Sequence, residues 1–146
     1  MSSLNPYLVY NGNCEEAFNF YKKVFRSTDL HITRYKEAPE EAKKFFPSAS
    51  DESVLHATLK IDENMVIMGN DHADPSTQLK KPFSVDFYLY VDMDSPKEAI
   101  RIFNELSIAG KVIMPIVETF WSPVYGILTD RFGINWKLTS HQSNED

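Results

Sequence analysis

The chain has 146 residues, of which 42% are hydrophobic and 13% aromatic, enough to bury the core of one compact domain. Its formal net charge of −6 argues against a nucleic-acid partner, because such proteins present a basic face. No apolar stretch approaches the roughly 18 residues of a membrane span, and the N-terminus lacks the features of a signal peptide. The single cysteine cannot form an internal disulfide, so we expect a cytoplasmic protein without nucleic-acid or membrane partners.

The first half of the chain predicts one helix among four strands. Asn13 and Glu16 form a capping-box-like pair that starts the helix. The spacing i, i+3, i+4, i+7 gives the helix an apolar face that packs on a sheet, made of Ala17, Phe20, Tyr21 and Val24. We expect strands over 6–10, 28–35, 54–61 and 65–69, with a charged loop over 37–52 that could include one helical turn at 39–46.

The second half predicts the same order of elements. Ser95 and Glu98 form a capping box with Pro96 at the first helical position, and Gly110 is expected to end the helix at C′. Strands are expected over 83–91, 112–117, 121–129 and 135–139. We therefore divide the chain into a first module (1–70), a linker (71–82), a second module (83–140) and a frayed tail (141–146).

The two predicted helices are an internal repeat. A shift of 82 positions superposes Glu16 on Glu98, Ala17 on Ala99, Phe20 on Ile102, Tyr21 on Phe103 and Val24 on Leu106. Such a repeat predicts an α+β chain of two βαβββ modules packed about a pseudo-two-fold axis, with any cavity lined by both modules.

Five segments carry a resemblance to a known superfamily. They are Pro6-Tyr7-Leu8, Glu16-Ala17-x-x-Phe20-Tyr21, Leu55-His56-Ala57-x-Leu59, Thr119-Phe120-Trp121 and Asp130-x-Phe132-Gly133-x-x-Trp136. With the paired modules, the chain resembles the vicinal oxygen chelate (glyoxalase/bleomycin resistance protein/dioxygenase) superfamily, and more closely its PhnB-like subgroup. The resemblance implies a cupped mixed β-sheet and a homodimer. Proteins of this subgroup are often labelled demethylubiquinone methyltransferases, but the sequence lacks the glycine-rich nucleotide-binding turn of common methyltransferases.

The resemblance also bears on metal binding. Metal-dependent members of the superfamily hold a divalent ion with His, Gln or Glu from equivalent strands of both modules. The matching positions here are Pro6, Asp86 and Lys137. Proline has no ligating side chain, and a lysine ammonium would repel the ion. We therefore expect no standard metal centre and no cofactor, and we expect an Asp86–Lys137 ion pair where the metal would lie.

His56 is the candidate catalytic residue. It alternates with Leu55 and Ala57, so it faces away from the expected core stripe, and its imidazole can exchange a proton near neutral pH. The alternative is a structural histidine that is hydrogen-bonded across the sheet. The candidate ligand-binding residues are His56, Asp86, Phe120, Trp121 and Tyr125.

The aromatic members of this candidate set would suit a pocket for a flat or hydrophobic small molecule. The alternative is that they pack in the core. Further tyrosines could line matching walls in the two modules, namely Tyr7, Tyr10, Tyr88 and Tyr90. Cys14 lies at a helix start, which lowers the pKa of a thiol, but without a basic neighbour we assign it no role. We also assign no role to His31 or His141, and we interpret the Asp71-His72-Ala73-Asp74 segment as a solvated turn.

The sequence thus predicts a PhnB-like protein that binds a small organic molecule in a cavity between its modules, without the standard metal centre. One alternative is an enzyme of the same superfamily, with metal-assisted or His56 acid–base lyase, isomerase or transferase chemistry. The second alternative is a dimeric interaction protein.

Overall fold

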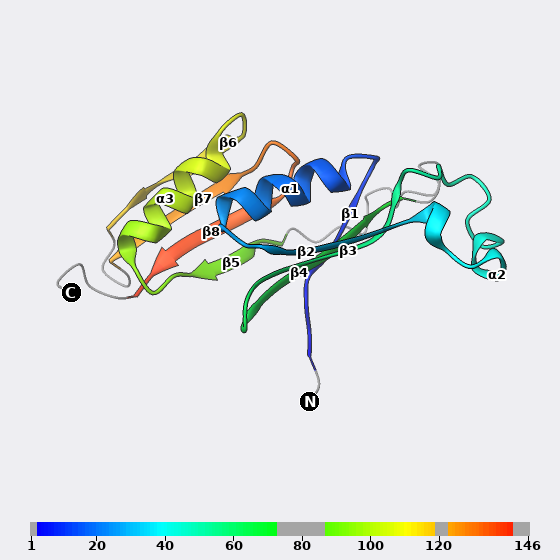
Figure 1. Cartoon of the computed structure of the whole chain (residues 1–146). Coiled ribbons are helices and arrows are strands. Elements are labelled where there is room, and N and C mark those ends of the chain that lie inside the picture. Colours follow the sequence, from blue (N-terminus) through cyan, green and yellow to red (C-terminus); the bar gives the residue numbers. More distant parts are fainter. Residues whose placement is uncertain (1–2, 73–86, 119–122, 142–146) are drawn as a thin grey trace. The chain divides into compact units, whose positions relative to one another are not determined.

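The structure, a computed structural model, describes residues 3–72, 87–118 and 123–141. The chain forms two compact units, Met1–Ser84 and Val85–Asp146 (Figure 1). Each unit contains a four-stranded mixed sheet, and the described residues form three α-helices, so the expected α+β class is confirmed. In the described ranges, no helix is long and apolar enough to cross a membrane.

The first unit has the predicted βαβββ order. Its sheet is arranged β1-β4-β3-β2, with β1 parallel to β4 and the other neighbours antiparallel. Helix α1 packs on one face of this sheet, against β2, β3 and β4 (Figure 1). The elements are β1 (Tyr7–Tyr10), α1 (Cys14–Val24), β2 (Asp29–Arg34), the 3₁₀ turn η1 (Tyr35–Glu37), α2 (Glu40–Lys43), β3 (Val54–Asp62) and β4 (Met65–Asp71).

The core of this unit differs from the predicted helix face at one position. Helix α1 buries Phe18, whereas Phe20 is only half-buried. The reason lies in the sheet: a Cβ added at Gly69 would lie 3.0 Å from the Phe18 ring and 2.5 Å from the Leu8 carbonyl oxygen. The glycine therefore leaves the space that Phe18 fills, and helical periodicity alone cannot show such a space.

The start of α1 is capped from a distant strand. Asn13 makes no side-chain capping bond, so the predicted Asn13 cap is wrong. The Asp71 carboxylate accepts hydrogen bonds from the N–H groups of Gly12 (3.0 Å) and Cys14 (2.9 Å), and from Val54 N–H (2.9 Å). The interpretation of Asp71 as a solvated turn residue is also wrong, because it ends β4 and is 3% exposed. Three backbone donors solvate this carboxylate in place of water.

The second unit repeats this architecture, with sheet order β5-β8-β7-β6 and β5 parallel to β8. Ser95 caps its helix as predicted, because its Oγ accepts from Glu98 N–H at 3.3 Å. The predicted Gly110 cap is wrong, since Ala109 takes the left-handed conformation (φ 60°). The elements are β5 (Leu89–Asp92), α3 (Pro96–Ser107), β6 (Lys111–Val117), β7 (Val124–Thr129) and β8 (Asn135–Ser140).

The segment between β7 and β8 is an ordered turn. Asp130 Oδ1 accepts from the N–H groups of Phe132 (2.8 Å) and Ile134 (3.0 Å), and Oδ2 accepts from Trp136 Nε1 (2.9 Å). Gly133 has a φ of 87°, which favours glycine. This segment, from Asp130 to Trp136, is one of those that carry the family resemblance, and its side chains hold the β7–β8 turn together.

The helical repeat is visible in the packing of both units. Matched positions in α1 and α3 are buried at four places, namely Cys14 and Pro96, Ala17 and Ala99, Tyr21 and Phe103, and Val24 and Leu106. The helix thus packs on the sheet through equivalent positions in both modules.

Candidate functional site

The face of the first sheet that points away from α1 carries His56, the candidate catalytic residue. Along β1, Leu8 and Tyr10 are buried toward the helix, whereas Tyr7 and Val9 are 45% and 48% exposed. The same alternation continues on β3 and β4. We call this surface the open face, and define it by Tyr7, Val9, His56, Thr58, Met68 and Asn70.

His56 is held at both ring nitrogens on the open face. Its Nδ1 lies 3.3 Å from the Tyr7 hydroxyl, and its Nε2 lies 2.9 Å from Thr58 Oγ1. The Tyr7 and His56 rings are tilted by 36° with centroids 5.6 Å apart. Partial burial, together with Cys14 and Tyr35, raises the pKa of Tyr7. Tyr7 therefore stays a phenol that can donate to Nδ1, and Nε2–H can then donate to Thr58.

This arrangement is compatible with both interpretations of His56. Hydrogen bonds at both nitrogens fix the ring, as in a structural histidine. They also orient an imidazole that can accept or donate a proton at a half-exposed surface. The acid–base role of His56 therefore stays a prediction.

The second unit holds the other candidate residues that the structure describes. Tyr125 lies on the face away from α3, because the neighbouring Gly126 faces Phe103, whose ring would lie 2.7 Å from an added Cβ. Lys137 places its ammonium 4.7 Å from the centre of the Tyr88 ring, a cation–π contact. Asp86, Phe120 and Trp121 lie outside the described residues, so the Asp86–Lys137 pair stays a prediction.

Two residues lie in the core and not at a pocket wall. Tyr10 is 5% exposed and its hydroxyl lies 3.1 Å from that of Tyr21, so its predicted place in a tyrosine wall is wrong. Cys14 is fully buried, and burial, helped by the charges of Asp71 and Glu15, raises its thiol pKa to about 12. The expected lowering by the helix N-terminus is therefore wrong, because desolvation dominates.

The remaining histidines that we left without a role are at the surface. His31 lies 3.1 Å from Asp29, and His141 lies 3.0 Å from Asp92. Both are more than 45% exposed at the side chain, so they are ordinary surface contacts.

Two of the three positions that the resemblance assigns to metal ligands, Pro6 and Lys137, carry side chains that cannot bind a divalent ion, and the third, Asp86, lies outside the described residues. Pro6 offers only its backbone carbonyl, which already accepts from Met68 N–H at 3.1 Å. Lys137 presents a cation to the face on which it lies. Within the described ranges, no three His, Cys, Asp or Glu side chains gather where they could hold a metal.

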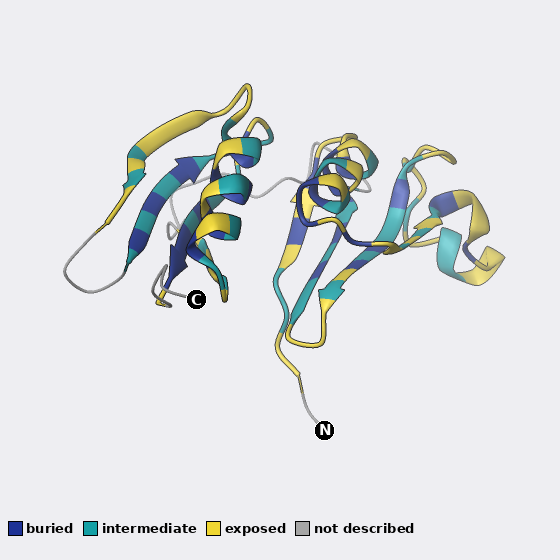
Figure 2. Cartoon of the chain, turned by 60° about the vertical axis from the view of Figure 1, so that its left-hand side comes forward, coloured by how far each residue is buried: buried dark blue, intermediate teal, exposed yellow. Residues whose placement is uncertain are grey.

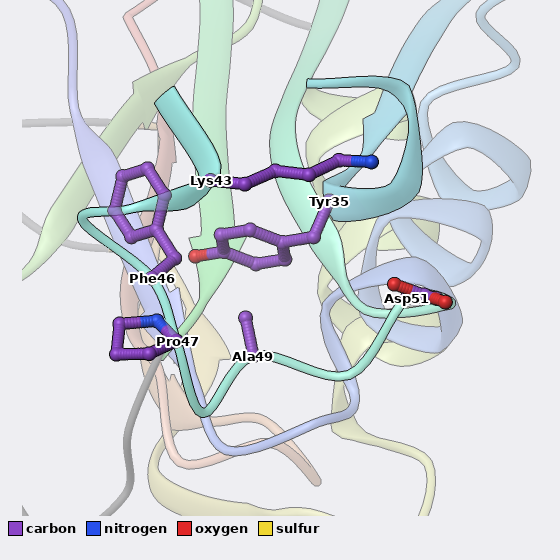
Figure 3. Close-up of a pocket in the computed structure, with 6 residues that line it drawn as sticks. All are labelled: Tyr35, Lys43, Phe46, Pro47, Ala49 and Asp51. Carbon is purple, nitrogen blue, oxygen red and sulfur yellow. The ribbon is translucent and has the colours of Figure 1, made fainter. Parts of the chain in front are cut away.

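A small surface cavity in the β2–β3 connection was not signalled by the sequence. It has a volume of about 180 Å³, and Figure 3 shows the Tyr35 ring at its centre with Lys43 on one side and Pro47 on the other. The Tyr35 hydroxyl donates to the Asp71 carbonyl (3.1 Å), and Lys43 pairs with Glu40 (3.3 Å). Asp51 also lines the cavity, and the Tyr35 and Lys43 polar groups already have these partners.

Comparison with known proteins places the chain in a family. Residues 2–139 match the family described as 3-demethylubiquinone-9 3-methyltransferase. The chain belongs to this family. It is 32% identical over 141 residues to Protein YjdN of Escherichia coli (strain K12), covering 92% of each chain.

Solved structures agree with this membership. Protein PA1353 from Pseudomonas aeruginosa is 31% identical with a TM-score of 0.81, covering 98% of this chain and 100% of that one. The PhnB protein from Bacillus cereus, named a putative 3-demethylubiquinone-9 3-methyltransferase, is 25% identical with a TM-score of 0.71, covering 95% and 99%. A glyoxylase/bleomycin resistance protein/dioxygenase domain from Frankia sp. EAN1pec shares the fold (12% identity, TM-score 0.63, covering 99% and 96%). The PhnB-like resemblance and the superfamily fold are confirmed.

Proposed function

We propose that the protein binds a small, flat organic molecule on the open face of its first unit. The observation that carries the proposal is the Tyr7–His56 pair, two rings that meet at a half-exposed sheet surface. Such rings offer a stacking surface together with hydrogen-bonding groups that orient a ligand. Met68 and Val9 extend the apolar part of this surface. Asp86, Phe120, Trp121 and Tyr125 stay predicted ligand contacts of the second module.

We further propose that binding proceeds without the standard metal centre. The support is chemical: a proline and a lysine occupy two of the three ligand positions that the resemblance implies. Elemental analysis for divalent metals on untagged, chelator-free protein tests this point. A metal bound near one equivalent per chain would overturn it.

The ligand-binding proposal predicts an effect of His56→Ala on the binding of a simple aromatic probe, phenol. We expect phenol to shift the backbone NMR signals of Tyr7, His56 and Thr58, and the variant to bind it about fivefold more weakly. This factor corresponds to the loss of one ring contact or hydrogen bond of about 1 kcal/mol. His31→Ala is the matched control, because His31 is exposed and pairs only with Asp29 among its described neighbours. An absence of shifts on the open face at millimolar phenol would contradict the proposal.

Formation of a homodimer is a second candidate function, and the exposed apolar side chains of β6 favour it. This edge strand of the second sheet exposes Val112 (44%), Ile113 (50%) and Val117 (47%). Figure 2 shows most of the strand in the colour of exposed residues. Pro115 lacks an N–H, and the ladder with β7 shifts register twice, so pairing through the backbone edge is disfavoured. A partner would therefore cover side chains.

We propose that this partner is a second copy of the chain, as the superfamily resemblance implies. Light scattering at micromolar concentration should then give a dimer mass, and Ile113→Asp should shift it toward the monomer. A monomer mass for the unmodified protein would sink the proposal.

A further inference from the structure

One polar atom on the open face is unsatisfied. Asn70 Oδ1 is buried and has no hydrogen-bond partner among the described residues. Folded proteins satisfy nearly all such atoms, so each exception calls for a reason. An amide oxygen can accept two hydrogen bonds and cannot donate, so the missing partner is an N–H or O–H group.

Asn70 lies next to the Tyr7–His56 pair on the intervening strand, where Met68 is opposite Tyr7 and Asn70 is opposite Val9. Its neighbours in β4, Gly69 and Asp71, face α1, so Asn70 points to the open face. Strand β4 lies between β1, which carries Tyr7, and β3, which carries His56. The Tyr7–His56 hydrogen bond therefore crosses over β4 on the side from which Asn70 projects.

This crossing contact is long and lies at the surface. The Tyr7 hydroxyl and His56 Nδ1 are 3.3 Å apart, longer than the roughly 2.7–3.2 Å of well-formed hydrogen bonds. Tyr7 is also 45% exposed, so part of the residue borders solvent. A ligand ring that takes the place of Tyr7 beside His56 would border Met68 and Asn70, so a polar group on that ring would have Asn70 as a neighbour.

We propose that Asn70 selects ligands that carry a hydrogen-bond donor on a flat ring, by accepting that donor at Oδ1. The proposal rests on the ligand-binding function argued above. It names the ligand class as hydroxyl- or amino-substituted aromatic molecules, in contrast to the corresponding ethers, which only accept. Asn70 is then a specificity residue and not a catalytic one.

The test compares phenol with anisole, which has the same ring without a donor, by NMR titration. We expect the unmodified protein to bind phenol about five- to tenfold more tightly than anisole, the worth of one hydrogen bond. Asn70→Leu should make the two affinities equal, whereas Asn70→Asp, which keeps an acceptor, should retain a preference for phenol. Asn19→Leu is the control, because Asn19 lies on the exposed side of α1.

The outcomes separate this inference from the function on which it rests. Equal binding of both probes by the unmodified protein, or an unchanged preference in Asn70→Leu, overturns the role of Asn70 and leaves ligand binding intact. A change in melting temperature with an unchanged preference likewise assigns Asn70 a structural role only. Failure of both probes to shift the open face overturns the proposed function and this inference together.

Discussion

Asp71→Ala is expected to lower the free energy of unfolding by about 4 kcal/mol. The carboxylate accepts three backbone hydrogen bonds at 2.9–3.0 Å while only 3% exposed. Bonds to a charged acceptor contribute about 1.5 kcal/mol or more each, and their removal leaves buried N–H groups without partners. The loss would loosen the start of α1 and its junction with β3 together, since Gly12 and Val54 share this acceptor. Chemical denaturation followed by circular dichroism measures the effect.

Two variants sharpen this test. Asp62→Ala removes a carboxylate that accepts one N–H, from Asn64, in the exposed β3–β4 turn, and should cost less than about 1 kcal/mol. Asp71→Asn keeps one acceptor oxygen but turns an NH₂ group toward an N–H donor. Its loss of unfolding free energy should therefore lie between the losses of Asp62→Ala and Asp71→Ala. A loss below about 1 kcal/mol for Asp71→Ala would show that the backbone donors find other partners.

Asp130→Ala should be the next most damaging change, at about 3 kcal/mol. Its carboxylate is 3% exposed and accepts from two turn N–H groups and from the indole of Trp136. Without it, the β7–β8 turn and the buried indole both lose a charged acceptor. The midpoint of urea unfolding, at unchanged slope, reports the change in stability.

A double-mutant cycle isolates the contact between Asp130 and Trp136. Trp136→Phe removes the indole N–H and some buried volume, and we expect it to cost about 2 kcal/mol alone. Because the two single variants remove the same hydrogen bond, the double variant should lose less than their sum. Strict additivity would mean that the 2.9 Å contact does not contribute to stability.

Strand β4 carries both a residue predicted to stabilise the fold and a residue proposed to contact the ligand. Asp71 anchors the end of this strand to α1, and the preceding residue, Asn70, points to the open face. Substitution of Asp71 should therefore weaken phenol binding indirectly. Substitution of Asp130, which lies in the β7–β8 turn and outside the open face, should weaken it less in any protein that still folds. A stability loss can thus be separated from a change in the site.

Local patterns in the sequence determined the elements. The 3.6-residue spacing on α1 and α3 depends only on neighbours along the chain, so it predicts both helices and most of their buried faces, Phe20 being the exception. The Ser95 cap is local in the same way, because its donor lies three residues away. The family resemblance was also recoverable, since the Asp130–Trp136 turn is one continuous segment.

Only the tertiary structure decided which groups complete these elements and which meet at the open face. The acceptor for Cys14 N–H lies 57 residues along the chain, and Tyr7 and His56 are 49 residues apart. The space under Phe18 exists because β4 places a glycine there. Strand pairing sets each of these contacts, and pairing depends on register between distant segments, which no local periodicity encodes. Burial then raised the Cys14 pKa where the helix start alone predicted a lower one.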